Sequence, residues 1–176
     1  MNTFENLYSR RTVRTYNGTP ITPAQEAEIL KAGQAAPIGR RRYDTLHISV
    51  ITSADFIAKW EERTSEMNGE PDSHPFYGAP TVILVSSEIM PPPSDNVNYS
   101  NAAIVVHNMA IAATELGVGA CHIWGAVRTL QQAPDLIAEL QIPSGMLPCC
   151  AIALGQTDES YSLRDIPDRI VTNFLR

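Results

Sequence analysis

The chain has 176 residues, of which 44% are hydrophobic and 18% charged, and a formal net charge of −6 at pH 7. This length and apolar content suit one folded domain with a single core, and they argue against two domains or disorder. The acidic balance excludes broad nucleic-acid binding, which would need local basic patches. We therefore expect a single domain over residues 1–176 that has no nucleic-acid partner.

Compartment and metal chemistry are constrained by the same composition. No apolar stretch approaches the roughly 18 residues that a membrane-spanning helix needs, and the polar start does not resemble a secretory signal. We therefore expect no membrane partner and a cytoplasmic location. Cys121, Cys149 and Cys150 are an odd number and include an adjacent pair, so reduced, buried thiols are expected. No histidine or cysteine spacing supports a metal site.

The N-terminal half alternates helix and strand patterns. Thr22 predicts a helix N-cap and Pro37 the end of that helix. β-Branched residues predict core strands over 46–52 and 81–87. An amphipathic helix is expected between them over 53–68, with four apolar side chains turned inward: Phe56, Ile57, Trp60 and Met67.

The C-terminal half is more apolar. Consecutive prolines predict a loop over 90–100. Residues 101–116 are apolar apart from one narrow polar edge, which predicts a helix in the core or in a subunit interface. Buried strands are expected over 118–124 and 146–155, with a helix over 129–143 between them. This order of elements predicts a sheet of four or five strands with helices on both faces.

The opening segment "YSRRTVRTY" gathers three arginines in an acidic chain. In an extended stretch alternate residues point the same way, so Arg10, Thr12 and Arg14 would line one side and Arg11 the other. Guanidinium groups present forked donors that suit phosphate oxygens. The segment is therefore either an anion site or a solvated basic turn.

A second candidate is "AAPIGRRRYD", residues 35–44. Pro37 ends a helix, and Gly39 lets the backbone approach a flat ligand closely. Arg40, Arg41 and Arg42 add three cations. For these arginines taken one by one, an exposed charged loop is the favoured interpretation.

A third candidate is "CHIWGAV", in which Gly125 leaves its backbone N–H open to a ring acceptor and Trp124 offers an aromatic wall. Periodicity alone favours a core position for Trp124. His47, His107 and His122 are interpreted as structural polar groups. The sequence lacks the glycine motifs of a dinucleotide fold or a P-loop, and it lacks a nucleophile elbow.

Together these segments resemble the FMN-dependent nitroreductase family along nearly the whole chain. The resemblance is carried by five stretches in the family's order: "SRRTVRTY", "ILKAGQAAPIG", "FYGAPTVILV", "NAAIVVHNMAIAATELGVGACHIWG" and "IALGQ". It implies an α+β fold, a three-layer α/β/α sandwich around a four- to five-stranded mixed or antiparallel sheet. It also implies a homodimer with FMN at the subunit interface, and a C-terminal tail, about 158–176, that reaches the partner.

The resemblance further implies a role for individual residues. Arg10, Arg11 and Thr12 would hold the ribityl phosphate, and Arg14 would reach the pyrimidine edge of the isoalloxazine. Arg164 matches one member of a C-terminal basic pair that also meets the phosphate. The other residues implied to bind the cofactor are Pro37, Ile38 and Gly39 from the partner chain, and His122, Ile123, Trp124 and Gly125 along the other side of the ring.

Two positions depart from the family pattern. Ser162 replaces the usual basic companion of Arg164. Arg40 to Tyr43 replace small polar residues followed by asparagine, glutamine, proline and tryptophan, in a stretch that often borders the substrate. We therefore take Arg41, Arg42 and Tyr43 as candidate substrate residues, which would favour an anionic substrate or the phosphate of a nicotinamide cofactor.

The implied activity is ping-pong transfer of electrons from NADH or NADPH, through FMN, to nitroaromatic, quinone or related small acceptors. No protein nucleophile or metal is required for it, because the flavin carries the chemistry. Alternatives with the same fold are dehalogenation, enoyl reduction and oxidative flavin cleavage. A non-catalytic flavin-binding or sensing protein, or a domain without cofactor, is the alternative from another class.

Overall fold

A four-stranded antiparallel sheet lies at the centre of the protein, in the strand order β1-β2-β4-β3. The computed structural model describes residues 1–176. The strands are β1 (Leu46–Ile51), β2 (Thr81–Glu88), β3 (Gly119–Ile123) and β4 (Met146–Gly155). The helices are α1 (Thr3–Ser9), α2 (Pro23–Gln34), α3 (Ala54–Asn68), α4 (Asp95–Glu115), α5 (Gly125–Leu130) and α6 (Pro134–Glu139).

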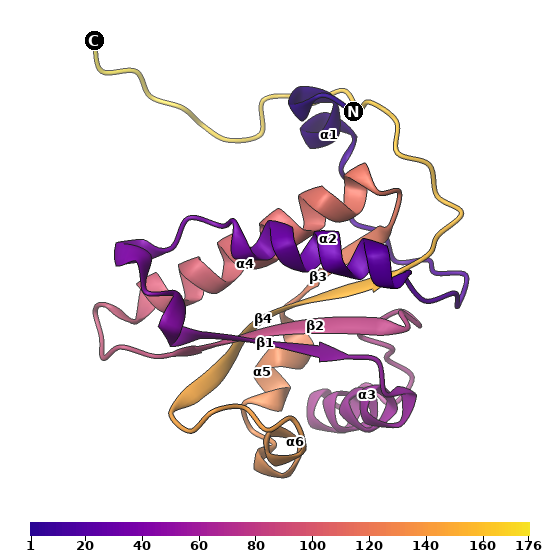
Figure 1. Ribbon diagram of the computed structural model, residues 1–176, viewed down its shortest axis with the longest axis vertical. Coiled ribbons are helices and arrows are strands. Elements are labelled where there is room, and N and C mark those ends of the chain that lie inside the picture. The colour runs from indigo at the N-terminus through magenta and orange to yellow at the C-terminus, as the bar shows by residue number, and fades with distance from the viewer.

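The helices cover both faces of this sheet, which makes a three-layer α/β/α sandwich (Figure 1). α2 and α4 lie on one face, and α3, α5 and α6 on the other. Successive residues of a strand point to opposite faces, so Ile83 and Val85 of β2 join the core beside α4 while Val82 and Leu84 join the core beside α3. This two-sided burial explains the continuous apolar run of β2. The predicted α+β sandwich is confirmed.

Several helices and strands begin or end where the local sequence predicted. Thr22 caps α2 in a reciprocal capping box with Gln25. β1, β2, β3 and β4 begin and end within one residue of the predicted strands, and Phe56, Ile57 and Trp60 are buried on α3. Met67 is 41% exposed, so its predicted inward position is wrong. It lies in the last turn of α3, after the last buried residue of the helix, Ser65.

Other expectations need correction. α1 was not expected, although Asn2 and Glu5 form a capping box at its start. α4 begins at Asp95 within the predicted loop, because the prolines of that loop end at Pro93 and a carboxylate favours a helix N-terminus. The helix expected over 129–143 is two short helices, since Pro134 starts a second one.

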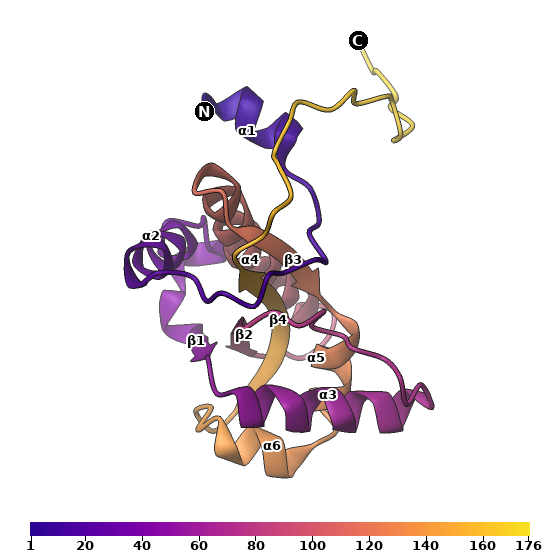
Figure 2. The same cartoon turned by 90° about the vertical axis from the view of Figure 1, so that its right-hand side faces the viewer.

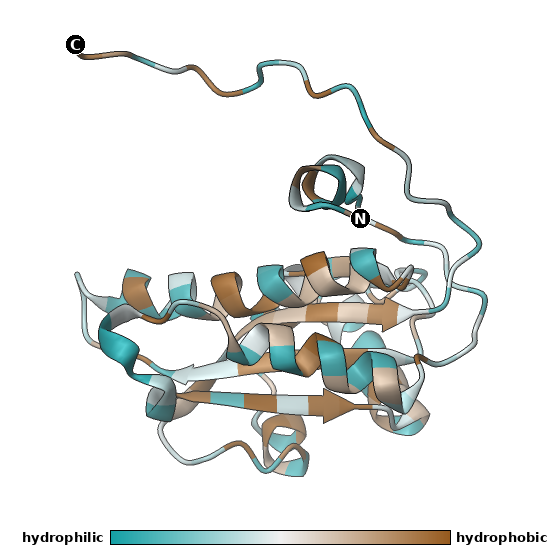
Figure 3. Cartoon of the chain, turned by 45° about the horizontal axis from the view of Figure 1, so that its top comes forward, coloured by the Kyte–Doolittle hydropathy of each residue, from teal (hydrophilic) through white to brown (hydrophobic).

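The C-terminal tail forms no strand in the single chain. No helix or strand follows β4, and the tail runs out past α1 on the side of α2 and α4 (Figures 1 and 2). The tail carries apolar residues, drawn brown, and stands apart from the rest of the chain (Figure 3). A lone extended segment has no ladder partner, so the tail stays irregular in the single chain. None of the helices has the length and apolar character needed to cross a membrane.

Candidate functional site

The arginine segment leaves α1 and runs beside strand β3. The backbone N–H of Val13 donates a 3.0 Å hydrogen bond to the carbonyl of Ala120, and the Val13 side chain is fully buried. Because extended residues alternate, this anchor turns Thr12 and Arg14 outward. One buried valine therefore fixes which way the neighbouring polar side chains point.

Arg10 and Arg164 form a positive cluster where this segment meets the C-terminal tail. Arg164 donates from Nε and from its backbone N–H to the carbonyl of Tyr8, at 3.1 and 3.3 Å. The pKa of Arg10 is lowered, first by burial and then by the nearby charge of Arg164. Neither arginine has a carboxylate within ion-pair distance. Two guanidinium groups held together without a counterion make a site for an anion.

Arg11 lies at the edge of this cluster. Its guanidinium contacts the carbonyl of Ser160 at 3.4 Å and the carboxylate of Glu159 at 3.7 Å. Tyr161, the next residue of the tail, donates a 2.7 Å hydrogen bond to the carbonyl of Val118. The start of the tail is thus tied down beside the arginines, although the rest of it extends away.

Two imidazole rings complete this side of the site. His107 of α4 and His122 of β3 lie with ring centroids 5.7 Å apart. Burial, with the nearby His107 and Arg10, lowers the pKa of His122 to about 4. Burial and Arg10 also lower the pKa of His107. Near neutral pH both rings are therefore largely uncharged and add no positive charge beside the two guanidinium groups.

Arg14 lies further along, where its guanidinium stands over the ring of Tyr77 at 5.6 Å from the centroid. A cation over an aromatic face at this distance is attracted by the ring quadrupole. Tyr77 itself has a φ of 57°, an uncommon conformation for a non-glycine residue. The structure therefore holds Tyr77 in place at some conformational cost.

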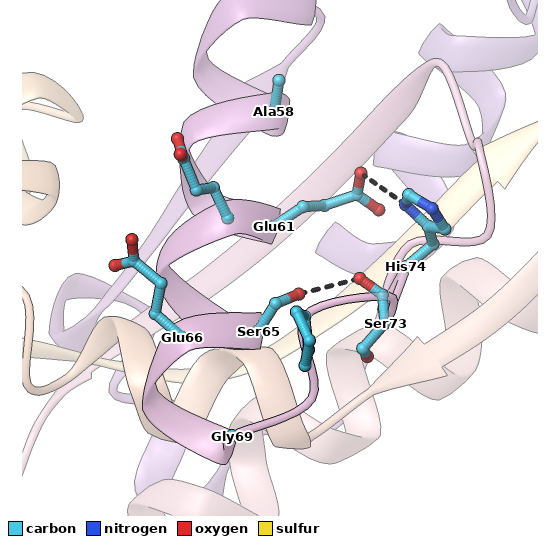
Figure 4. Close-up of a pocket in the computed structure, with 9 residues that line it drawn as sticks. Ala58, Glu61, Ser65, Glu66, Gly69, Ser73 and His74 are labelled. Atoms are coloured by element: carbon cyan, nitrogen blue, oxygen red, sulfur yellow. Dashed lines mark hydrogen bonds and ion pairs between the residues drawn. The ribbon is translucent and has the colours of Figure 1, made fainter.

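The loop that carries Tyr77 is anchored on α3. The backbone N–H of Phe76 donates to the Glu61 carboxylate at 3.1 Å, and Ser65 donates to the carbonyl of Ser73 at 2.8 Å. Figure 4 shows the Ser65 contact together with the contact of His74 Nδ1 and the Glu61 carboxylate, 3.7 Å apart. These contacts border a cavity of about 710 Å³ beside α3.

Tyr77 and the end of β3 border a smaller cavity of about 220 Å³. Trp124 is 52% exposed there, so it is not a core residue. Gly125 begins α5, and a Cβ added to it would meet no atom within 4 Å. The predicted residues that border this cavity are His122, Ile123, Trp124 and Gly125. The exposed indole and the open space at Gly125 leave room for a flat ligand.

The segment Pro37–Gly39 lies elsewhere in the chain. Gly39 donates its backbone N–H to Asn101 Oδ1 at 3.1 Å, near the start of α4, whereas Asn6 beside the arginines donates to the carbonyl of Ile111. Ten residues of helix separate these two attachment points, which is about 15 Å. One chain therefore does not bring Pro37, Ile38 and Gly39 to the arginine cluster.

The residues after Gly39 are mostly engaged with their neighbours. Arg42 Nε lies 3.1 Å from both carboxylate oxygens of Asp44, and Tyr43 donates its hydroxyl to the carbonyl of Ala36 at 3.1 Å. Arg40 and Arg41 have left-handed φ values of 56° and 58° and make no ion pair. The charge of Arg42 is therefore balanced by Asp44, whereas Arg40 and Arg41 have no carboxylate partner.

Sequence reasoning missed some residues of this region. Tyr77 was not singled out, although "FYGAP" combines an aromatic residue with turn formers. Asn101 was noted only as part of a polar helix edge. No group of three or more histidine, cysteine, aspartate or glutamate side chains has a metal-binding arrangement. All three cysteines are buried and unpaired.

The chain matches the model of a known family. The model of the nitroreductase family matches residues 7–156, and the chain belongs to that family. A relative, the FMN reductase (NADPH) of Bacillus subtilis, is 26% identical over an alignment 178 residues long. The alignment covers 88% of this chain and 65% of that protein.

Solved structures show the same fold. The nitroreductase with bound FMN from Bacteroides fragilis superposes with a TM-score of 0.84 at 24% identity, over 99% of this chain and 100% of that one. The nitroreductase with bound FMN from Desulfitobacterium hafniense gives 0.85 at 18% identity, again over 99% and 100%. The likeness therefore extends over both chains almost completely.

Proposed function

We propose that this protein is an FMN-dependent oxidoreductase that takes electrons from NADH or NADPH and passes them to nitroaromatic, quinone or related small acceptors. The observation that carries the proposal is the half-buried pair of Arg10 and Arg164, which has no carboxylate partner and suits a phosphate. Family membership and the FMN bound in the matching structures support it.

The residues present fit the cofactor at both of its ends. The unpaired guanidinium groups suit a phosphate dianion, and the open space at Gly125 suits the edge of a flat ring. We infer that the phosphate is held by Arg10, Arg11, Thr12 and Arg164, and that the ring lies along His122, Ile123, Trp124 and Gly125. Bound FMN would supply the chemistry, accepting a hydride and passing electrons to the acceptor.

The chain's own residues would orient the ring and set its electrostatics. A guanidinium at the pyrimidine edge stabilises negative charge that develops there on reduction, which is the role we assign to Arg14. The Tyr77 ring beneath it limits where that guanidinium can lie. His122, uncharged near pH 7, would pack against the cofactor without adding a second positive charge.

We further propose that the site is completed by a second copy of the chain. Pro37, Ile38 and Gly39 would come from the partner subunit, since in one chain Gly39 and Asn6 are attached to α4 at points about 15 Å apart. The tail, about 158–176, would cross to the partner. This would cover apolar side chains that the single chain leaves exposed: Leu163, Ile166, Ile170, Val171, Phe174 and Leu175.

Uptake of FMN followed by anaerobic bleaching tests the proposed activity. We expect the protein to bind FMN with quenching of flavin fluorescence, and NADH or NADPH to bleach the bound flavin. A nitroaromatic, a quinone and an enone are then added separately to find which acceptor restores the yellow colour. A protein that takes up no FMN contradicts the proposal, and a flavin that neither nucleotide bleaches favours a non-catalytic binding protein.

A further inference from the structure

Two helices that lie side by side on one face of the sheet, α3 and α5, are joined by buried hydrogen bonds (Figure 2). The indole N–H of Trp60 donates to the carbonyl of Ala126 at 2.9 Å, across 66 positions of the chain. The Thr129 hydroxyl lies within donating distance of the same carbonyl, at 2.8 Å. Because Ala126 directly follows Gly125, these donors hold the first turn of α5 against α3.

The Thr64 hydroxyl extends this network along α3. Its Oγ1 lies 2.8 Å from the Trp60 carbonyl and 2.8 Å from Thr129 Oγ1. The two hydroxyls carry one proton each, so the chain of hydrogen bonds runs either toward the Ala126 carbonyl or toward the Trp60 carbonyl. In both directions each hydroxyl keeps a partner. All four residues are at most 2% exposed, so water does not replace these contacts.

Trp60 also holds a second segment beside the cavity of about 220 Å³. Its ring packs edge-on against Phe76, with the ring centroids 4.7 Å apart, and Phe76 directly precedes Tyr77. The cavity is lined by Tyr77 and Gly125, and also by Thr64 of the network. One fully buried side chain therefore helps to place both segments that border the cavity.

We propose that Trp60, Thr64 and Thr129 are positioning residues for the ring of the cofactor. The inference rests on the proposed function, which places a flat ring against Gly125. A Cβ added to Gly125 would meet no atom within 4 Å, so its outer side is open while the network holds the next residue from the protein side. A backbone that is already in place before a ligand arrives costs less to order on binding. The three side chains thus act through the first turn of α5.

Flavin binding by hydroxyl variants, measured by fluorescence quenching with the purified full chain, tests this role. Thr129→Val keeps the shape of the side chain but removes the hydroxyl, so it should raise the dissociation constant of FMN about fivefold. Riboflavin should lose the same factor, whereas loss of a phosphate contact affects FMN alone. Thr129→Ser restores the hydroxyl and should bind both flavins within about twofold of the wild type. Thr64→Val should weaken both flavins equally, which keeps the test decisive if Thr129→Val does not fold.

Thr81→Val is the matched control, because Thr81 is 1% exposed, its hydroxyl has no partner and it does not line the cavity. It should leave both dissociation constants unchanged. Urea denaturation of the FMN-free variants shows that they are folded, and lower stability alone does not change the affinity of the folded fraction. Wild-type affinity in both valine variants, a loss confined to FMN, or an equal loss in Thr81→Val would overturn the positioning role alone. A wild type that binds neither flavin would overturn the proposed function as well.

Discussion

The guanidinium of Arg14 lies over the ring of Tyr77, 5.6 Å from its centroid, although the two residues come from opposite ends of the N-terminal half of the chain. The backbone N–H of Phe76 is held by Glu61, and the Phe76 ring packs edge-on against buried Trp60 at 4.7 Å. α3 therefore determines where Tyr77 lies. Through Tyr77 it limits where the positive charge of Arg14 lies.

The position of Arg14 leads to a prediction of how the reduction potential of bound FMN changes when this residue is replaced. Removal of a cation near the reduced ring should make reduction harder, so Arg14→Ala should lower the potential on the order of 30 mV, or about 1.4 kcal/mol for two electrons. Tyr77→Leu should give a smaller decrease in the same direction, and Tyr77→Phe, which keeps the ring but loses the hydroxyl, should give the smallest decrease of the three. Spectroelectrochemical titration measures the potential. An unshifted potential in an Arg14→Ala protein that still binds FMN would remove this role.

Substitution of Gly125 should weaken FMN binding without lowering the free energy of unfolding. A Cβ there meets no atom of the chain, and alanine favours the helix that Gly125 begins. Gly125→Ala should therefore unfold in urea with unchanged or slightly higher free energy, by at most about 1 kcal/mol. If the flavin lies against this backbone, FMN affinity should fall about tenfold or more, as measured by fluorescence quenching. Unchanged affinity would place the flavin elsewhere.

Arg10 and Arg164 are predicted to act together on the phosphate. Arg10→Gln and Arg164→Gln should each raise the dissociation constant of FMN about tenfold, because each removes a charge-assisted hydrogen bond. The stability of the FMN-free protein should not fall for Arg10→Gln, since the repulsion between the two guanidinium groups is relieved. Riboflavin, which lacks the phosphate, should bind all three proteins equally.

Arg63→Gln serves as the charge control for this pair, because Arg63 contacts Asp135 on the surface of α3 and lies outside the candidate site. It should leave the dissociation constant of FMN unchanged. If this variant weakens FMN binding as much as Arg10→Gln does, then overall charge rather than a phosphate contact governs the affinity.

The lowered pKa of His122 predicts that the folded chain loses stability in acid. Its pKa is lowered from 6.5 to about 4 in the folded chain, so the unfolded chain takes up the proton more readily between these values. The stabilisation is present above pH 6.5 and is lost as the pH falls to about 4. The full shift is worth about 3 kcal/mol, which solvent around the ring reduces to about 2 kcal/mol.

Urea denaturation of the FMN-free protein at pH 7 and pH 4.5 measures this effect. The variant His122→Gln carries no titrating group at this position, so it should lose less stability than the wild type between the two pH values. His107, whose pKa is also lowered, should retain part of the pH dependence. An identical loss in His122→Gln and the wild type would show that other groups cause it.

Local pattern predicted most of the elements of the fold. Thr22 marked the start of α2 because a hydroxyl can satisfy a free N–H at a helix end within a few residues. The β-branched runs marked β1 and β2 for an equally local reason. The prediction of one helix over 129–143 was wrong, because Pro134 cannot continue a helix and begins a second one, whatever the apolar periodicity around it indicates.

The candidate site was predicted less completely. Arg10 and Arg14 were picked out by their clustering, and the resemblance assigned them different roles, which remain proposals. Tyr77 carried no such pattern, because its position depends on the contact of Glu61 with the backbone of its loop. The contact of Asn101 with Gly39 was equally hidden, since it joins residues that are 62 positions apart in the chain.

The sequence by itself determined the sandwich, the burial of its strands and the cluster of arginines near the start of an acidic chain, because periodicity, capping and charge are properties of neighbouring residues. Only the tertiary structure decided which charges stay unpaired. Arg42 forms an ion pair with Asp44, two residues away, whereas Arg10 lies beside Arg164 from the other end of the chain. Pairing depends on distances across the fold, and these are set by packing rather than by order along the chain.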